Sequence, residues 1–520
     1  MNPVVFHPNI IKGDYMKTII LTILFTMLFV PTISANPKNI DELGIKGIDL
    51  VFDMQFEQAN KIFDEMIRMD PENAIGYFLK SKSYLWMTIF SANDNDKEHI
   101  ERSLELFLKT IDIAKEMLDR NEDDIDALFY IGNAYGYIGR RYGETGSWIK
   151  AYWYGRKGTN YLKKVIKKDP DYYDAYYGLG MYHYYTSVLP KFIKVLSFLL
   201  GGLEGDREKG IDEVILASSK GNLTRSEAKL LVAAEIYLNY EKNYEAALPL
   251  LKELTTEYPH NHFYKFNLAD CYRNLYKYDL SFQTIEKALQ SESLNEYPYL
   301  RSQIYYLLGR TYSEMNEFDK AISAYQSAYK ISQSEKGNKS WVYSWSQFSI
   351  GLCYEMMGSI DKAHEYYSQI KKEDNEGAYK YAQAMIKNPL TPAKINLTKG
   401  KNYLKCEKYT QAYTIFNDLI ESELNENPLN TTFIAEVYHN LGKVEYELKE
   451  YQKSIQTYRK VFALNDIKED WIKPWSHYYL ANCYRDIGEA EKAKHEYDIA
   501  YEYDDNKIRS DIDKARSGLE

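Results

Sequence analysis

The chain has 520 residues, of which 45% are hydrophobic and 27% are charged, so it is long enough and apolar enough to bury a large core. Its 75 acidic and 65 basic residues give a formal net charge of −10, which disfavours a general role in binding nucleic acids, because their phosphates would be repelled. Tyrosine is unusually frequent, with 51 residues, and its apolar ring and polar hydroxyl suit both helix packing and binding surfaces.

The first predicted element is a secretory signal peptide that begins at Met16. Lys17 supplies a positive charge, residues 18–30 form an apolar stretch, and a break at Pro31 leads to small residues up to Ala35. This order predicts cleavage after Ala35 and export to the periplasm or another extracytoplasmic compartment. The apolar stretch is shorter than the roughly 20 residues that span a bilayer, which favours a cleaved signal peptide. The alternative is an uncleaved membrane anchor.

Residues 36–225 are expected to form helical hairpins with insertions. The first hairpin has Gly47, then Ala59 twelve residues later and Phe63 sixteen residues later. Between residues 74 and 221 hairpins are still readable, but the helices are longer and the loops are extended. This region is therefore predicted to continue the architecture of the rest of the chain in a stretched form.

A segment from Tyr130 to Gly158 is dense in Gly, Tyr, Trp and Arg. Its glycines suit close helix packing or turns. Four of its basic residues could hold an anion or a carboxylate: Arg140, Arg141, Arg156 and Lys157. The alternative is that long helices pack through aromatic rings here and leave their charges in water.

The next segment, Ser187 to Gly210, combines an apolar face with a Gly-Gly break. Residues 187–203 could accordingly lie on a membrane surface or against a partner, although an ordinary core insert is the favoured interpretation.

From residue 226 onward one pattern returns: a small residue, an aromatic three positions later, a small residue at twelve and an aromatic at sixteen. The clearest units are Gly309, Tyr312, Ala321 and Tyr325; Gly351, Tyr354, Ala363 and Tyr367; Gly400, Tyr403, Ala412 and Phe416; and Ala481, Tyr484, Ala493 and Tyr497. The spacing predicts two antiparallel helices per unit, since small residues permit close approach and aromatic rings fill the flanking volume. Glu235 and Glu445 depart from the pattern.

This pattern resembles the tetratricopeptide repeat. The resemblance implies an all-α fold, a right-handed α-solenoid of about eleven helical hairpins. We expect a signal peptide at 1–35, N-terminal repeats with insertions at 36–225, a central array at 226–390 and a C-terminal array at 391–520. Leu189-Pro190 and Gly205-Asp206-Arg207 also resemble a short stretch of the eukaryotic inclusion-body-clearance tetratricopeptide family, which implies a helical insert but no activity.

In this repeat class the first helix of each hairpin lines an inner groove. The resemblance places these partner-binding candidates there: Phe266, Asn267, Asp270, Arg273, Tyr306, Arg310, Trp345, Trp475, Tyr478, Asn482 and Arg485. The same frame adds Phe263, Phe348, His439, Asn440 and Lys443. Aromatic rings interleaved with amides and guanidinium groups suit an extended peptide, although each residue alone could be surface filler. The carboxylate-clamp pattern of the family is matched only in part.

No catalytic residue, cofactor or metal site is predicted. Cys271, Cys353 and Cys483 occupy one repeated position, so they should be buried thiols too far apart for disulfides. His364-Glu365 lacks the second histidine of a zinc-protease helix, and no phosphate-binding glycine loop occurs.

The sequence thus predicts an exported scaffold that is not an enzyme and that binds protein or peptide through its groove. A membrane-surface protein docking through residues 187–203 is one alternative. A hydrolase of envelope substrates, hidden within residues 126–221, is another.

Overall fold

The structure is a computed structural model that describes residues 37–91, 96–188, 205–333, 341–426, 431–503 and 506–516. Throughout these ranges every regular element is a helix, which confirms the all-α prediction. The expected signal peptide and residues 189–203 of the expected membrane segment lie outside the described residues. None of the described helices is both long enough and apolar enough to cross a membrane.

The chain divides into two compact units. Unit 1 comprises Met1–Met87 and Lys97–Ala228, and unit 2 comprises Thr88–Asp96 and Lys229–Glu520. The expected boundaries at 225/226 and 390/391 stay predictions.

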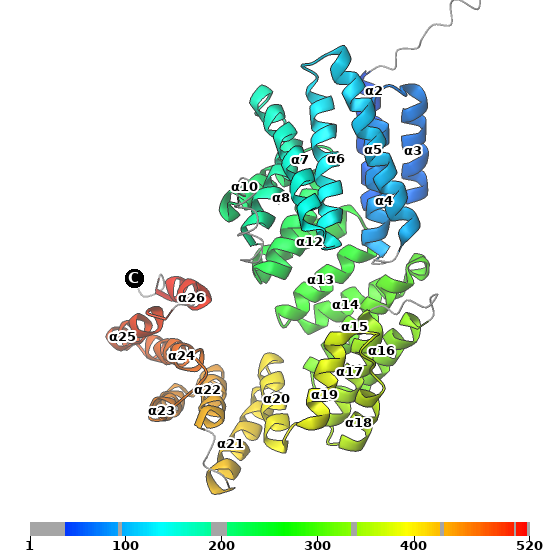
Figure 1. Cartoon of the computed structure of the whole chain (residues 1–520). Coiled ribbons are helices and arrows are strands. Elements are labelled where there is room, and N and C mark those ends of the chain that lie inside the picture. Colours follow the sequence, from blue (N-terminus) through cyan, green and yellow to red (C-terminus); the bar gives the residue numbers. More distant parts are fainter. Residues whose placement is uncertain are drawn as a thin grey trace, which may run out of the picture. The chain divides into compact units, whose positions relative to one another are not determined.

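Unit 1 is built from helical pairs (Figure 1). Its helices are α2 (Pro37–Phe52), α3 (Phe56–Met69), α4 (Ala74–Ser91, grouped with unit 2 from Thr88), α5 (Lys97–Arg120), α6 (Ile125–Glu144), α7 (Trp148–Lys168), α8 (Asp174–Val188), α10 (Arg207–Lys220) and α11 (Arg225–Leu230).

Unit 2 begins at the end of α11 with η1, a π-helix at Leu231–Tyr240 that contains Glu235, one of the residues that depart from the repeat. The other elements are α12 (Tyr244–Glu257), α13 (His262–Asn274), α14 (Tyr278–Leu289), the 3₁₀ helix η2 (Glu292–Glu296), α15 (Pro298–Glu314), α16 (Phe318–Ser332), α17 (Trp341–Met356), α18 (Ile360–Ser368), α19 (Glu376–Lys387), α20 (Pro392–Lys405), α21 (Tyr409–Glu426), α22 (Thr431–Glu447), α23 (Tyr451–Phe462), α24 (Ile472–Asp486), α25 (Ala490–Tyr501) and α26 (Asn506–Arg516).

The sixteen-residue spacing of the repeat has a direct steric cause. A Cβ atom added to Gly309 would lie 2.6 Å from the ring of Tyr325, sixteen residues later. The same test at Gly400 gives 2.5 Å to the ring of Phe416. Because the aromatic ring of the second helix rests on the backbone of the first, only a very small side chain fits opposite it.

The turn between the paired helices is also repeated. Seven residues after the small position the backbone takes a positive φ, as at Asn316 (64°), Glu407 (56°) and Lys449 (62°), and at the glycines Gly358 (80°) and Gly488 (82°). This left-handed residue ends the first helix and redirects the chain into the second.

Glycines bring α6 and α7 of unit 1 into close contact. A Cβ atom on Gly158 would lie 2.6 Å from the carbonyl oxygen of Gly132, and one on Gly139 would lie 2.9 Å from the amide nitrogen of Gly155. The prediction that glycines from Tyr130 to Gly158 serve close packing is confirmed for this pair of helices.

A buried ion pair connects distant parts of unit 1. The Lys82 Nζ atom lies 2.8 Å from Glu227 Oε2, and both side chains have no exposed surface. Glu227 also accepts hydrogen bonds from the hydroxyls of Tyr137 at 2.6 Å and Tyr177 at 3.0 Å. Lys82 donates a second bond to the carbonyl oxygen of Leu223 at 3.1 Å. Several partners thus compensate the desolvation of the two charges.

Candidate partner-binding surface

The predicted binding residues lie on four helices of unit 2: α13, α15, α17 and α24. In Figure 1 the helices of this unit follow a curve, and α13, α17, α20, α22 and α24 lie toward its inner side. The repeat frame predicts that the first helix of each hairpin faces inward, and a binding groove along these helices stays a prediction.

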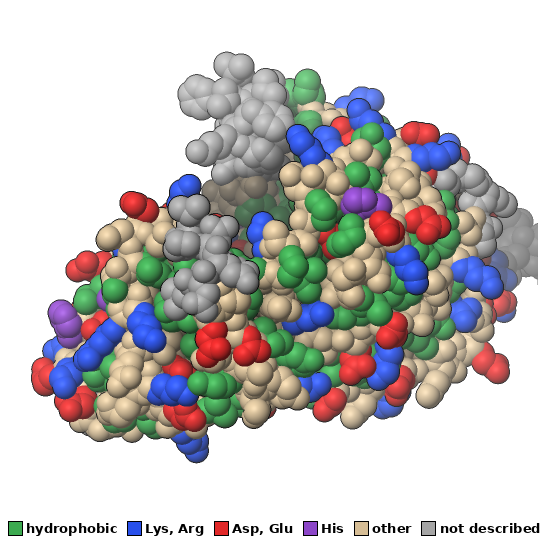
Figure 2. All heavy atoms as spheres, turned by 90° about the horizontal axis from the view of Figure 1, so that it is seen from below, with side chains coloured by type: hydrophobic (Ala, Val, Ile, Leu, Met, Phe, Trp, Pro, Cys, Tyr) green, Lys and Arg blue, Asp and Glu red, His purple; other side chains and the backbone are tan. Residues whose placement is uncertain are grey.

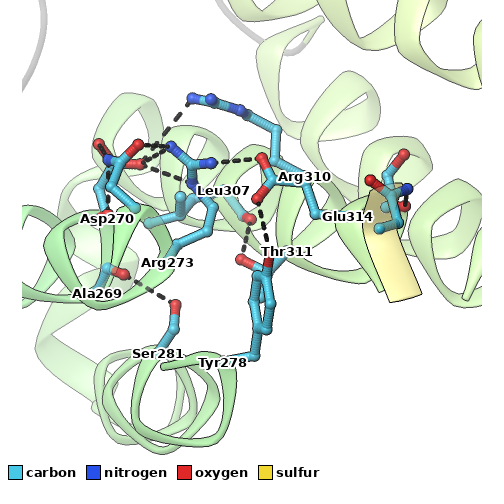
Figure 3. A network of polar contacts seen from close by, with 12 residues as sticks. Ala269, Asp270, Arg273, Tyr278, Ser281, Leu307, Arg310, Thr311 and Glu314 are labelled. Atoms are coloured by element: carbon cyan, nitrogen blue, oxygen red, sulfur yellow. Dashed lines mark hydrogen bonds and ion pairs between the residues drawn. The ribbon is translucent and has the colours of Figure 1, made fainter. Parts of the chain in front are cut away.

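Charged side chains of α13 and α15 form one network, which we call the α13–α15 cluster: Asp270, Arg273, Arg310 and Glu314 (Figure 3). Arg273 is 5% exposed, donates from Nε to Asp270 Oδ1 at 3.0 Å and pairs with Glu314. Burial opposes the charge on Arg273, but the two carboxylates outweigh it and raise its pKa. Arg273 is therefore committed to internal partners.

Arg310 is the part of this cluster that is available to a ligand. Its side chain is 42% exposed, and its nearest guanidinium nitrogen is 4.0 Å from Asp270 Oδ1. Figure 3 shows the Arg310 side chain extending across the cluster from α15 toward Asp270. A planar guanidinium with one distant counter-ion can still bind a carboxylate or a backbone carbonyl.

Aromatic rings lie on the same four helices as the predicted binding residues. Tyr306 lies 5.2 Å from the ring of Trp341 and 5.3 Å from that of Tyr325, measured between centroids. Trp345 lies 5.6 Å from Phe348 in an edge-to-face arrangement. The remaining predicted rings are in similar surroundings, with Phe266 6.4 Å from Phe263 and Trp475 5.5 Å from Tyr478. All of these side chains except Trp341 and Tyr325 were predicted as binding residues or as members of the same inner frame.

The predicted residues of α24 form a second network. The hydroxyl of Tyr497 donates to Asn482 Oδ1 at 2.5 Å. Arg485 donates from Nε to Asp486 at 2.7 Å and from a terminal nitrogen to the hydroxyl of Tyr446 at 3.3 Å. Burial opposes the charge on Arg485, but the hydrogen bond to Asp486 together with the charges of Tyr497, Asp486 and Tyr446 outweighs it and raises the pKa of Arg485.

Two amides predicted to meet a partner are buried and engaged within the protein. Asn267 donates to the carbonyl oxygen of Phe263 at 2.8 Å and is 5% exposed, and Asn482 is 4% exposed. The structure thus assembles the candidates as one cluster on α13 and α15 and another on α24. Contact of either cluster with a partner stays a prediction.

Two lysines of the inner helices stand apart from these networks. Lys443 of α22 was predicted on this face, and Lys405 of α20 was not. Lys443 Nζ lies 5.0 Å from the ring centroid of Tyr479, and Lys405 Nζ lies 5.5 Å from that of Tyr276. Among the described residues neither ammonium group forms an ion pair, although Glu314 near Lys405 and Glu447 near Lys443 favour the charged forms. Burial lowers the pKa of both lysines.

Three residues of these two networks were not predicted from the sequence. Glu314 completes the α13–α15 cluster, and Tyr446 and Asp486 complete the network of α24. Each lies in the last turn of a first helix, one to four residues beyond the last position to which the repeat frame assigns binding. The recurrence of an acidic or aromatic residue at the end of the first helix in successive repeats could have indicated them.

The four basic residues expected to hold an anion do not converge. Arg140 and Arg141 both pair with Glu144, at 3.0 and 3.2 Å, while Arg156 donates to the hydroxyl of Tyr152 at 2.7 Å. Within the described ranges no group of three or more His, Cys, Asp or Glu side chains is arranged to hold a metal ion.

Three of the cysteines are buried free thiols, as predicted. Burial raises the pKa of Cys271 and of Cys353 to about 12, and that of Cys483 to about 11. Cys406 is only partly buried.

Family models of the tetratricopeptide repeat match residues 261–334 and 435–467. The chain contains tetratricopeptide repeats. Its solenoid of helical hairpins is the fold expected from the repeat, and a scaffold for protein interaction is the role that this family supports. The resemblance of residues 189–207 to the inclusion-body-clearance family stays a prediction.

Curated relatives match parts of the chain. The TPR repeat-containing protein MJ1428 of Methanocaldococcus jannaschii is 24% identical over 326 residues, which are 52% of this chain and 55% of the relative. Response regulator aspartate phosphatase A of Bacillus subtilis is 26% identical over 176 residues, 33% of this chain and 44% of the relative. The chain thus spans about half the length of these relatives. A solved tetratricopeptide repeat protein from Parabacteroides merdae is 16% identical, with a TM-score of 0.24, and the match covers 56% of this chain and 98% of that one.

Proposed function

We propose that this tetratricopeptide-repeat protein is an exported scaffold, not an enzyme, that binds an extended acidic segment of a protein partner along the inner helices of unit 2. The observation that carries the proposal is the pair of lysines, Lys405 and Lys443. Each is half-buried beside a tyrosine ring and forms no ion pair among the described residues. Glu314 near Lys405 and Glu447 near Lys443 favour the charged forms, but they do not offset the desolvation. Desolvated ammonium groups favour an anionic ligand, because the ligand replaces the solvation that burial removed.

Neighbouring side chains would support such a segment. The exposed guanidinium of Arg310 can take a further carboxylate or a main-chain carbonyl, and the ring of Tyr306, one turn earlier on α15, offers an apolar contact beside it. An extended chain uses both kinds of contact, since polar groups fix its register and rings hold its side chains.

Fluorescence anisotropy with labelled peptides tests this proposal. The probe is a flexible peptide of alternating Glu and Ser, and its counterpart has Gln at every Glu. We expect the purified chain to prefer the acidic peptide, and Lys405→Gln with Lys443→Gln to weaken binding roughly tenfold or more.

A matched control uses two exposed lysines of α19, Lys380→Gln with Lys387→Gln, which change the net charge equally. Equal binding of both peptides, or equal losses in the two double variants, would contradict a specific inner site. Export is tested separately by fractionating cells and sequencing the N-terminus of the mature chain, which we expect to begin after Ala35. Screening the purified chain against envelope substrates tests the absence of catalysis, and turnover that depends on a residue of this chain would overturn it.

A further inference from the structure

The helix α7 of unit 1 has a charge pattern that its function as a repeat helix does not require. It contains seven basic and no acidic residues, in a chain whose net charge is −10. Elsewhere the signs are mixed, and Figure 2 shows basic and acidic side chains interspersed over one face of the molecule. The basic residues of α7 are Lys150, Arg156, Lys157, Lys163, Lys164, Lys167 and Lys168.

Large apolar side chains are exposed at the start of the same helix. Ile149 is 66% exposed, Trp153 is 51% exposed and Trp148 is 43% exposed. At 100° per residue these three positions fall on one side of the helix, and Arg156, Lys163 and Lys167 continue that side toward its C-terminal end. The outer face of α7 is therefore apolar in its first turns and basic in the rest.

Three lysines follow one another along one edge of this face. Lys150, Lys157 and Lys164 are seven residues apart, so their attachment points are about 10 Å apart along the helix. Each ammonium group lies over a tyrosine ring, at 5.0 Å for Tyr142, 5.1 Å for Tyr135 and 5.2 Å for Tyr161. The rings hold the exposed lysines in a row without neutralising them.

We propose that the outer face of α7 docks on the surface of an anionic lipid bilayer. Tryptophan and isoleucine at one end can enter the boundary between headgroups and acyl chains, while the row of lysines meets the negative headgroups. This surface belongs to unit 1, is separate from the inner helices of unit 2 and is not the segment 187–203.

Other occupants fit this face less well. A second copy docked through the same face would bring two predominantly basic faces together, which opposes a symmetric dimer. A nucleic acid would meet the lysines but would gain little from burying Ile149, Trp148 and Trp153, and the net charge of the chain would repel it.

Vesicle flotation with the full-length chain tests the proposal, at low salt and at physiological salt. The probes are vesicles of phosphatidylcholine alone and vesicles of equal parts phosphatidylcholine and phosphatidylglycerol. We expect binding to the second kind only. Lys150→Gln with Lys157→Gln and Lys164→Gln should lower the partition coefficient roughly a hundred-fold, since each lysine near such a surface contributes about a factor of five.

A second variant removes the apolar contribution: Trp148→Ser, Ile149→Ser and Trp153→Ser. We expect it to lose at least about ten-fold in binding, while its helix content by circular dichroism stays unchanged because all three side chains are exposed. The matched control replaces other exposed apolar residues of unit 1, Ile45, Leu108 and Ile215, with Ser and should bind like the unmodified chain.

Three results would overturn the proposal. One is absence of binding to anionic vesicles. Another is binding that neither α7 variant weakens but that Phe192→Ser with Phe198→Ser abolishes, which would assign the contact to another segment. The third is a monomer–dimer change in the apolar variant without any effect on vesicles, which would assign this face to a second copy. The variant Lys405→Gln with Lys443→Gln should float like the unmodified chain, so that failure of the peptide site and failure of the lipid surface are distinguishable.

Discussion

At the scale of single residues, His439 on α22 shows how burial sets the response of the solenoid to pH. Its Nδ1 atom lies 2.9 Å from Ser476 Oγ of α24, and burial, with nearby Lys443 and Lys401, lowers its pKa from 6.5 to about 3. Between these values the unfolded chain binds a proton at this position and the folded chain does not. The free energy of unfolding should therefore fall by about 1.4 kcal/mol for each pH unit below 6.5.

Urea unfolding at pH 7 and pH 5.5 measures this effect. The loss of stability on acidification should be smaller by about 1 kcal/mol in His439→Gln than in the unmodified chain. His495→Gln, on the exposed surface of α25, is the control and should leave the loss unchanged. Identical pH dependence of both variants would mean that His439 takes up its proton without unfolding.

The left-handed turn residues give a second prediction at this scale. Lys449 is exposed and holds a φ of 62°, whereas the equivalent residue in the next hairpin is Gly488. The left-handed region costs a residue with a side chain about 1 kcal/mol relative to glycine. Lys449→Gly should therefore stabilise the chain by several tenths of a kcal/mol or more, and Gly488→Ala should destabilise it by about 1 kcal/mol. Thermal unfolding compares them with Lys449→Ala, which should show no gain.

At the scale of elements, the buried network of Lys82 and Glu227 joins α4, α6, α8 and α11 of unit 1. Lys82→Met removes the positive partner and leaves a buried carboxylate, at a cost of about 3–5 kcal/mol. Adding Glu227→Gln should recover part of this loss, because the amide can still accept from the two tyrosine hydroxyls. Chemical denaturation of the single and double variants measures the coupling.

An exposed ion pair is the control for this cycle. Lys61 and Glu57 of α3 are 2.7 Å apart, with 72% and 84% of their side chains exposed. Lys61→Met should change the free energy of unfolding by less than about 1 kcal/mol. Similar costs at Lys61 and Lys82 would show that the buried network is not coupled to the packing of unit 1.

The repeated hairpins could be predicted from the sequence, whereas this network could not. The contact between Gly309 and Tyr325 can be predicted because other units contain the same pair of a small and an aromatic residue at the same spacing. Lys82 and Glu227 belong to different elements and have no repeated counterpart, so no spacing connects them. Their pairing depends on how four helices pack together.

The candidate site likewise has features that the sequence predicts and features that it does not. The frame selects residues such as Arg310 and Trp345 because it fixes which side of a helix they occupy. It does not report the contacts of each side chain, and Arg273 is therefore selected although Asp270 and Glu314 already hold it. Lys405 was not predicted because its interest lies in its burial without an ion pair among the described residues, and burial depends on how the helices pack.

At the scale of the whole molecule, each hairpin of a solenoid contacts mainly its neighbours, so damage should stay local. Gly442 tests this, because a Cβ atom there would lie 2.8 Å from the ring of Tyr458. Gly442→Val must displace that ring and loosen the α22–α23 hairpin, at a cost of about 1–3 kcal/mol. Hydrogen exchange followed by mass spectrometry should then show faster exchange from α21 to α24 and unchanged exchange in α6 and α7. An equal acceleration throughout the chain would instead mean that both units unfold as one cooperative body, and Lys449→Ala in the same hairpin supplies the baseline.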